Sequence, residues 1–159
     1  TVFDCCWLGV TVCNQAEADE KIPILLQTPA AHRWVSIEPM LGSIDLHYYL
    51  PDWTARAMGE ALGVDVSCAT LDAVVLGGET GPGARPMRPR WVRKIRANCA
   101  AAGVPFFFKQ WGKHLPSYGD IYGDWEAPPM HVLVGDKSRL LDGREHNELP
   151  WKPITPQTR

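Results

Sequence analysis

Residues 71–112 decide the fold, and they read LDAVVLGGETGPGARPMRPRWVRKIRANCAAAGVPFFFKQWG. Two apolar runs, residues 71–79 and 104–112, lie on either side of an amphipathic segment. Short continuous apolar runs bounded by glycine and proline are typical of strands that are covered on both faces of a sheet. We therefore predict two buried strands here.

The segment between these strands, residues 88–103, predicts a helix. Pro89 suits the first turn of a helix, and Gly103 fits a C-terminal cap. Apolar side chains recur between them at helical spacing, namely Trp91, Val92, Ile95 and Cys99. A strand, a helix and a second strand in this order predict parallel pairing through a right-handed crossover.

The same order of elements occurs upstream. Residues 7–13 and 32–40 predict two further strands, and residues 14–28 predict a helix that Asn14 caps and that Pro23 kinks or splits. We predict an α/β fold in which parallel βα units form a partial TIM-like barrel, half of the full eight-stranded one. An open doubly wound sheet is the alternative arrangement of such units.

The periodicity divides the chain into two parts. Residues 1–112 contain the βα units, with residues 51–70 as an insertion, and residues 113–159 form an irregular, loop-rich C-terminal extension that should pack on the same domain. A short helix is expected over residues 43–50. Residues 131–135 and 138–143 are expected to form a small hairpin, with Asp142 and Gly143 at a turn.

Composition and charge narrow the class of protein. A chain of 159 residues can bury a core, and its formal net charge of -2 gives no general attraction to nucleic acid or to an anionic membrane. No apolar run approaches the roughly 18 residues of a membrane span, and no signal peptide is visible. Five cysteines without a C-x-x-C pair, and five scattered histidines, predict no metal site. We expect a cytoplasmic protein without a membrane partner.

Polar residues follow each of the four predicted strands. The carboxyl ends of parallel strands meet at one edge of a sheet, which is where ligands bind in such folds. We therefore expect Glu38, Glu79 and Lys109 to converge there as the catalytic group. Two carboxylates near an ammonium can share a proton, bind a cation or hold a substrate amine.

The residues around this group complete a predicted binding site for substrate or cofactor. Glycines after the third strand would let backbone N–H groups approach a ligand, and Arg85 could hold a carboxylate or phosphate by a two-pronged contact. A tight turn is the alternative role of these glycines, because the loop matches neither G-x-G-x-x-G nor a P-loop. The predicted binding residues are Asn14, Gln15, Gly77, Gly78, Arg85, Gln110 and Trp111. Trp7, Trp34 and Trp91 are expected in the core.

Three stretches together resemble a known family. They are WLGVTVCNQAEADEKIPILLQTPAAHRWVSIEPMLGSIDL, the whole of residues 71–112, and RLLDGREHNELP. They resemble the C-terminal two-thirds of a phage-borne family of uncharacterised proteins described as radical-SAM-like partial barrels. Members of that family carry an N-terminal three-cysteine motif, which would hold a [4Fe–4S] cluster for S-adenosylmethionine.

This sequence lacks that motif and begins at Thr1 without an initiator methionine. The resemblance therefore implies a C-terminal, substrate-side fragment, which holds no cofactor itself and is inactive alone. The cluster and S-adenosylmethionine would belong to a full-length protein. Cys13 stands where family members commonly have a glutamate, so the resemblance assigns no role to the end of the first strand.

Two other functions stay open. A cluster-independent α/β enzyme or an anion-binding protein would use Glu38, Glu79 and Arg85. A non-catalytic module would bind nucleic acid or protein through the basic helix at residues 88–102, which has five basic residues between positions 88 and 96. The substrate, whether a small molecule or nucleic acid, and any partner protein encoded nearby are not identified by the sequence.

Overall fold

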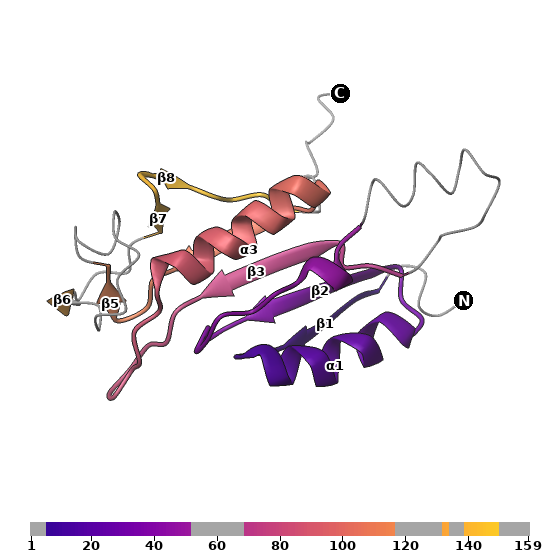
Figure 1. Cartoon of the computed structure of the whole chain (residues 1–159), viewed down its shortest axis with the longest axis horizontal. Coiled ribbons are helices and arrows are strands. Elements are labelled where there is room, and N and C mark those ends of the chain that lie inside the picture. The colour runs from indigo at the N-terminus through magenta and orange to yellow at the C-terminus, as the bar shows by residue number, and fades with distance from the viewer. Residues whose placement is uncertain (1–5, 52–68, 117–131, 134–138, 150–159) are drawn as a thin grey trace, which may run out of the picture.

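The structure, a computed structural model, describes residues 6–51, 69–116, 132–133 and 139–149 (Figure 1). The elements in chain order are β1 (Trp7–Thr11), α1 (Gln15–Gln27), β2 (His32–Ile37), the 3-10 helix η1 (His47–Tyr49), β3 (Ala73–Gly77), α3 (Pro89–Ala102), β4 (Phe106–Gln110), β5 (His114–Leu115), β6 (Val132–Leu133), β7 (Leu140–Leu141) and β8 (Arg144–Glu145).

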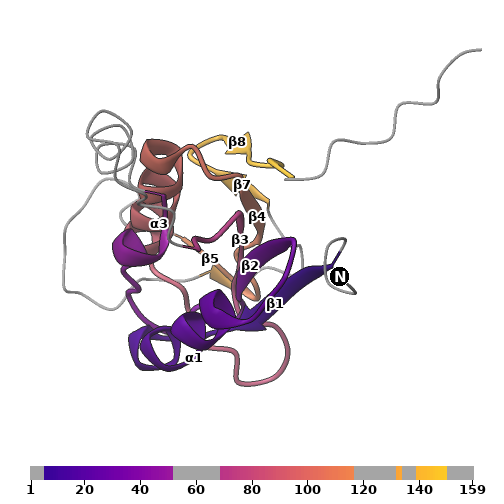
Figure 2. The ribbon, with the colours of Figure 1, turned by 90° about the vertical axis from the view of Figure 1, so that its right-hand side faces the viewer.

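The main sheet has four parallel strands in the order β1-β2-β3-β4 (Figure 1). This sequential order arises when successive right-handed crossovers place their helices on the same face of a sheet. Figure 2 shows α1 and α3 on one side of the strands. A doubly wound sheet has helices on both faces, and the described helices do not follow that arrangement. The α/β class and the parallel pairing are confirmed, whereas the half barrel stays a prediction.

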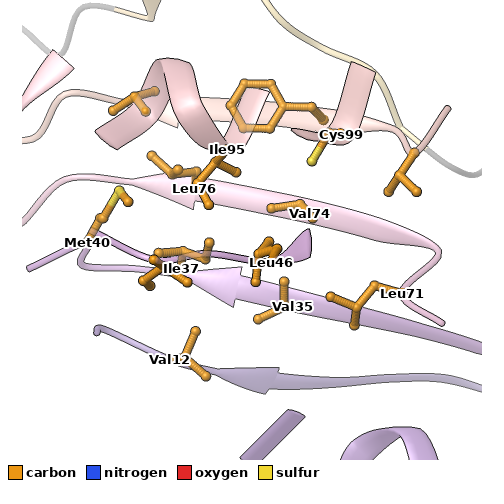
Figure 3. Close-up of a cluster of buried hydrophobic side chains, with 14 of the residues drawn as sticks. Val12, Val35, Ile37, Met40, Leu46, Leu71, Val74, Leu76, Ile95 and Cys99 are labelled. Carbon is orange, nitrogen blue, oxygen red and sulfur yellow. The ribbon is translucent and has the colours of Figure 1, made fainter. Parts of the chain in front are cut away.

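The hydrophobic core lies between the sheet and these helices (Figure 3). Alternate residues of each strand point to this face, because successive side chains of a strand point to opposite faces. Each fully buried aliphatic or aromatic side chain stabilises the fold by about 1.5–3 kcal/mol. The buried strand residues include Val35, Ile37, Val74, Leu76, Phe106 and Phe108, and their helical partners include Ala18, Ile22, Leu25, Val92, Ile95 and Cys99.

Local signals set the ends of both helices as the sequence predicts. The Asn14 side chain accepts a hydrogen bond from the Glu17 N–H at 3.0 Å and so caps α1. In α3, Pro89 occupies the first turn and Gly103 closes the helix in the left-handed conformation. Of the two effects predicted for Pro23, a kink or a split, the split does not occur: α1 continues through Pro23, because the packed apolar face holds the helix together despite one lost internal hydrogen bond.

The loops differ from the prediction in two places. The short helix expected at residues 43–50 is only the 3-10 turn η1. Asp142 and Gly143 do form a tight turn, with φ of 51° and 79°, but the turn joins β7 to β8. β6 pairs with β5 instead of with the 138–143 segment. The insertion predicted at 51–70 lies almost wholly outside the described residues.

Residues 139–149 pack beside β4 and α3. The Phe108 N–H donates to the His146 carbonyl at 2.9 Å, and Phe107 forms an antiparallel bridge with Asn147. Arg93 of α3 forms an ion pair with Asp142 at 2.6 Å. This segment therefore covers the outer edge of β4. None of the described helices is both long and apolar enough to cross a membrane.

Candidate functional site

The face of the sheet opposite the helices is only partly buried. The strand register sets Thr11, Ser36, Val75 and Phe107 side by side across it, and Thr11 is exposed while the others are half-buried. We call this the open face. Successive side chains of a strand point to opposite faces, so the residue two positions further along the chain lies on the same face. For these four residues, the next residues on the open face, toward the carboxyl edge, are Cys13, Glu38, Gly77 and Lys109.

Glu38 and Lys109 form an ion pair at this edge of the open face. Lys109 Nζ lies 2.7 Å from Glu38 Oε1. The residues belong to the ends of β2 and β4, which are separated by β3 and thus by about 10 Å, twice the usual strand spacing. Gly77 of β3 lies between them, and a Cβ there would be 2.9 Å from Glu38 Oε1. The missing side chain of Gly77 therefore makes room for the Glu38 carboxylate to reach across β3.

This pair has unused hydrogen-bonding capacity. No further hydrogen bond or ion pair of Glu38 or Lys109 occurs within the described residues. Glu38 Oε2 can therefore accept from a ligand, and the Lys109 ammonium has two N–H donors to offer. The side chains of Lys109 and Glu38 are 52% and 25% exposed, so a ligand can approach both.

Glu79 forms a second, different ion pair. Its Oε2 accepts from the Arg85 backbone N–H at 2.7 Å and from Nε at 2.9 Å, and its Oε1 accepts from a terminal guanidinium nitrogen at 2.8 Å. These contacts, led by the side-chain hydrogen bond, lower the pKa of Glu79 to about 2. Both carboxylate oxygens are already used, and the two-pronged contact expected of Arg85 is made to the chain's own loop. We call this arrangement the loop clasp.

The expected convergence is thus half correct. The structure brings Glu38 and Lys109 together, but it gives Glu79 a cation of its own. Gly81 and Gly83 have φ of 98° and 72°, and these conformations turn the chain so that Arg85 returns to Glu79. Glycine adopts such angles without the steric cost that other residues meet.

Gly77 and Gly78 serve packing, which corrects their predicted role in ligand approach. The space beside Gly77 is filled by Glu38, as above. A Cβ on Gly78 would lie 1.9 Å from the Trp111 carbonyl oxygen, and the Gly78 N–H already donates to the Gln110 carbonyl. These glycines hold the ends of β3 and β4 close together rather than exposing N–H groups to a ligand.

Asn14 and Gln15 are also engaged by the fold. Asn14 caps α1, as described above. The Gln15 side chain accepts from the Asp45 N–H at 2.6 Å and donates to Asp19 at 2.8 Å, which ties the loop after β2 to α1. Their side chains therefore position the carboxyl edge and are not directed to a ligand.

Gln110 and Trp111 lie inside the protein. The Trp111 side chain is 5% exposed, packs edge-on against Phe108 and donates from its indole nitrogen to the Leu140 carbonyl at 2.8 Å. Gln110 is 6% exposed, and its Oε1 has no hydrogen-bond partner in the described structure. Trp111 thus belongs to the core, and Gln110 keeps an unsatisfied acceptor beneath the edge.

A half-buried thiol, Cys13, follows the first strand. Burial raises the pKa of Cys13, and the charge of Glu17 raises it further. The raised pKa keeps Cys13 mainly in its protonated, weakly nucleophilic form at neutral pH.

Two of the five basic residues at positions 88–96 form ion pairs, and two others contact aromatic rings. Arg93 pairs with Asp142, and Lys94 pairs with Asp45 at 2.9 Å. Arg96 donates to the His146 ring at 3.3 Å, and Arg88 lies over the Trp91 ring. These contacts fix the helix to its surroundings and leave fewer cations of α3 available to a polyanion than the sequence suggests.

Two features of the open face were missed by sequence reasoning. Trp34 was expected in the core, but it is half-buried and lies over Gly9, where a Cβ would be 2.4 Å from its ring. The Arg139 guanidinium lies 5.1 Å from the Phe107 ring centre. The alternation of β2 could have placed Trp34, since it shares the face of Ser36 and Glu38. No local sequence pattern indicates that Arg139 lies against Phe107.

The described residues do not suit an iron–sulfur cluster. No group of three His, Cys, Asp or Glu side chains within that part of the chain could hold a metal ion. Cys99, for example, is buried in the core, and burial raises its pKa to about 12. A cluster requires three thiolates on one site, so the described cysteines do not provide one.

These observations define an α/β protein with a parallel sheet, whose described helices lie on one face, and with charged pairs at the carboxyl edge of that sheet. Over residues 2–150 the chain matches the family described as "Protein of unknown function (DUF5131)", and it belongs to that family. No curated protein and no solved structure matches the chain.

Proposed function

We propose that this chain forms the substrate-binding side of an enzyme active site, with the Glu38–Lys109 pair as the groups that contact the substrate. The observation that carries the proposal is the spare capacity of this half-exposed pair, at the edge where parallel α/β folds bind ligands. Each partner holds the other in place while still offering atoms to a ligand.

The loop clasp has a supporting role in this proposal. Glu79 and Arg85 satisfy one another and hold the loop that follows β3. The Arg85 side chain already holds the Glu79 carboxylate through Nε and one terminal nitrogen, so an anion bound there would lie beside that carboxylate and be repelled by it. This geometry makes the anion-binding alternative weaker than the substrate-side role.

The half-barrel arrangement and radical chemistry are the finer parts of the proposal. The sequential strand order, with α1 and α3 on one face, is the order that βα units have in a segment of a barrel, whose open face would be the inner wall. The resemblance in the sequence implies a radical-SAM-like reaction in a full-length cytoplasmic protein. A cluster would then be held by cysteines other than those of the described residues.

A screen for ligands tests the substrate-binding role. We expect one or more primary metabolites to raise the melting temperature of the protein. Glu38→Gln and Lys109→Met should remove that effect. Glu20 and Arg90 are exposed and lie outside the edge, so they give matched controls. The variants Glu20→Gln and Arg90→Gln should leave the ligand-induced rise in melting temperature unchanged. A ligand effect that survives both edge variants would overturn the proposal.

The radical-SAM-like part has a separate test. This chain, incubated anaerobically with iron, sulfide, dithionite and S-adenosylmethionine, should form no 5′-deoxyadenosine, because its described residues provide no cluster site. Reductive cleavage by the chain alone would contradict its assignment as the side without the cluster. That outcome would leave the binding role of Glu38 and Lys109 to be judged by the screen.

A further inference from the structure

The Glu38–Lys109 pair also limits the chemistry of its ligand, an inference that rests on the proposed substrate-binding role. The pair presents a carboxylate and an ammonium 2.7 Å apart on the same half-exposed edge. Each has capacity that the ion pair does not use, namely Glu38 Oε2 and two Lys109 N–H groups. Because the carboxylate and the ammonium are in contact, a ligand that meets both must carry a donor and an acceptor that are separated by only a few bonds.

We propose that the ligand is a small zwitterion whose ammonium and carboxylate groups lie on the same carbon or on neighbouring carbons, as in an amino acid. Its ammonium donates to Glu38 Oε2, and its carboxylate accepts from the Lys109 ammonium. The dipole of the ligand then lies antiparallel to the dipole of the pair. Both contacts are charge-assisted hydrogen bonds, which are stronger than bonds between neutral groups.

The charge balance of the edge supports a zwitterion over an ion. Lys109 is opposed by Glu38, and Arg85 is opposed by Glu79, so the two pairs carry no net charge. A phosphate or an isolated carboxylate would meet Lys109 but also the adjacent Glu38 carboxylate. An isolated amine would bind Glu38 but would be repelled by the adjacent Lys109 ammonium. A ligand with both charges avoids each conflict, because like charges in contact disfavour binding.

The spacing of the ligand charges follows from the same geometry. The two atoms that the pair offers are neighbours, so a molecule whose charges are separated by a long linker can satisfy only one of them. A free amino acid and the amino-acid part of a larger metabolite share the required chemistry. The dipeptide glycylglycine does not, because its ammonium and carboxylate lie at opposite ends.

The test is a titration followed by ¹H–¹⁵N NMR, with the backbone amides of Gly77, Gly78 and Lys109 as reporters. The probes are glycine, β-alanine, glycinamide, acetate and glycylglycine. Glycine and β-alanine should shift these amides. Glycinamide, acetate and glycylglycine should bind at least about tenfold more weakly, the equivalent of losing one hydrogen bond to a charged group.

Variants connect the shifts to the pair. Glu38→Gln and Lys109→Met should each reduce glycine binding at least about tenfold, and Glu20→Gln should not. Acetate binding as tightly as glycine would overturn the inference in favour of an anion site. Glycinamide binding as tightly would do so in favour of a cation site, and no shift at the highest soluble glycine concentration would also refute it.

The inference can fail while the proposed function stands. Metabolites that stabilise the protein through Glu38 and Lys109 but carry no zwitterionic group would refute the ligand class alone. A stabilising metabolite that is insensitive to both variants would refute the binding role as well.

Discussion

Two adjacent glycines provide a sharp test of how the edge is built, through Gly77→Ala and Gly78→Ala. The new methyl group at position 78 would lie 1.9 Å from a backbone carbonyl oxygen, that of Trp111, whereas at position 77 it would lie 2.9 Å from the end of the Glu38 side chain. A backbone atom can yield only if two strand ends separate. A side-chain carboxylate can move aside by rotation.

The expected free energies differ accordingly. Overpacking costs about 1–3 kcal/mol, and separating the strand ends would also weaken the Gly78 N–H bond to the Gln110 carbonyl, worth about 0.5–1.5 kcal/mol. We expect Gly78→Ala to lose about 3 kcal/mol of stability, or about 6–12 °C in melting temperature. At position 77, a small displacement cost is offset by about 0.4–1 kcal/mol from the less flexible unfolded chain. Gly77→Ala should stay within about 1 kcal/mol of the wild type.

Urea unfolding followed by tryptophan fluorescence measures both variants, since the chain has seven tryptophans. Gly77→Ala should also weaken ligand binding, because the methyl group displaces Glu38 from Lys109. Equal stability losses in the two variants would refute the reasoning. So would a Gly77→Ala protein that binds ligand normally.

Three further predictions concern ionisable and polar groups. The pKa of the Glu79 carboxyl, measured by ¹³C NMR, should be about 2. In Arg85→Met this pKa should return toward its ordinary value of 4.5. An unchanged pKa in that variant would contradict the loop clasp. The contribution of Glu79 to stability, full at neutral pH, should be lost as the pH falls from 4.5 to about 2, because its folded pKa lies below its unfolded one. Burial and, secondarily, the charge of Arg96 lower the pKa of His146 from 6.5. The free energy of unfolding, measured with urea, should therefore fall as the pH drops below 6.5, because the unfolded state then binds a proton that the folded state does not. The variant His146→Gln should show a weaker pH dependence. Gln110→Met should change the free energy of unfolding by less than about 1 kcal/mol, since it removes a buried acceptor without a partner, and a larger loss in urea unfolding would mean that the amide oxygen is bound.

Sequence reasoning succeeded where the determining interactions are local or follow from topology. Asn14 caps the start of α1 and Gly103 caps the end of α3 through contacts within one turn of the chain, so the local sequence is enough to predict both caps. The meeting of Glu38 with Lys109 follows from parallel pairing, because their strand ends share an edge wherever the strands lie in the sheet.

The failures have physical causes of another kind. Whether Arg85 meets a ligand or Glu79 depends on the path of a glycine-rich loop, and many paths are open to glycine. The space beside Gly78 is decided by Trp111, which is distant in sequence, so the residue type alone could not distinguish ligand approach from strand packing. The sequence predicts that Pro23 kinks or splits α1, but tertiary packing keeps the helix continuous through it. The pairing of β5 with β6 and of β7 with β8 was not predicted, because strands of two residues are too short to show a periodic pattern in the sequence.

The most direct test of the central claim compares the two carboxylates of the edge. The Glu38→Gln and Glu79→Gln proteins would be titrated side by side with glycine, followed by the amide shifts of Gly77 and Lys109. We predict that Glu38→Gln loses binding at least about tenfold, whereas Glu79→Gln loses stability in its loop but binds glycine as the wild type does. Loss of binding in Glu79→Gln with retention in Glu38→Gln would contradict the account and would place the ligand at the loop clasp.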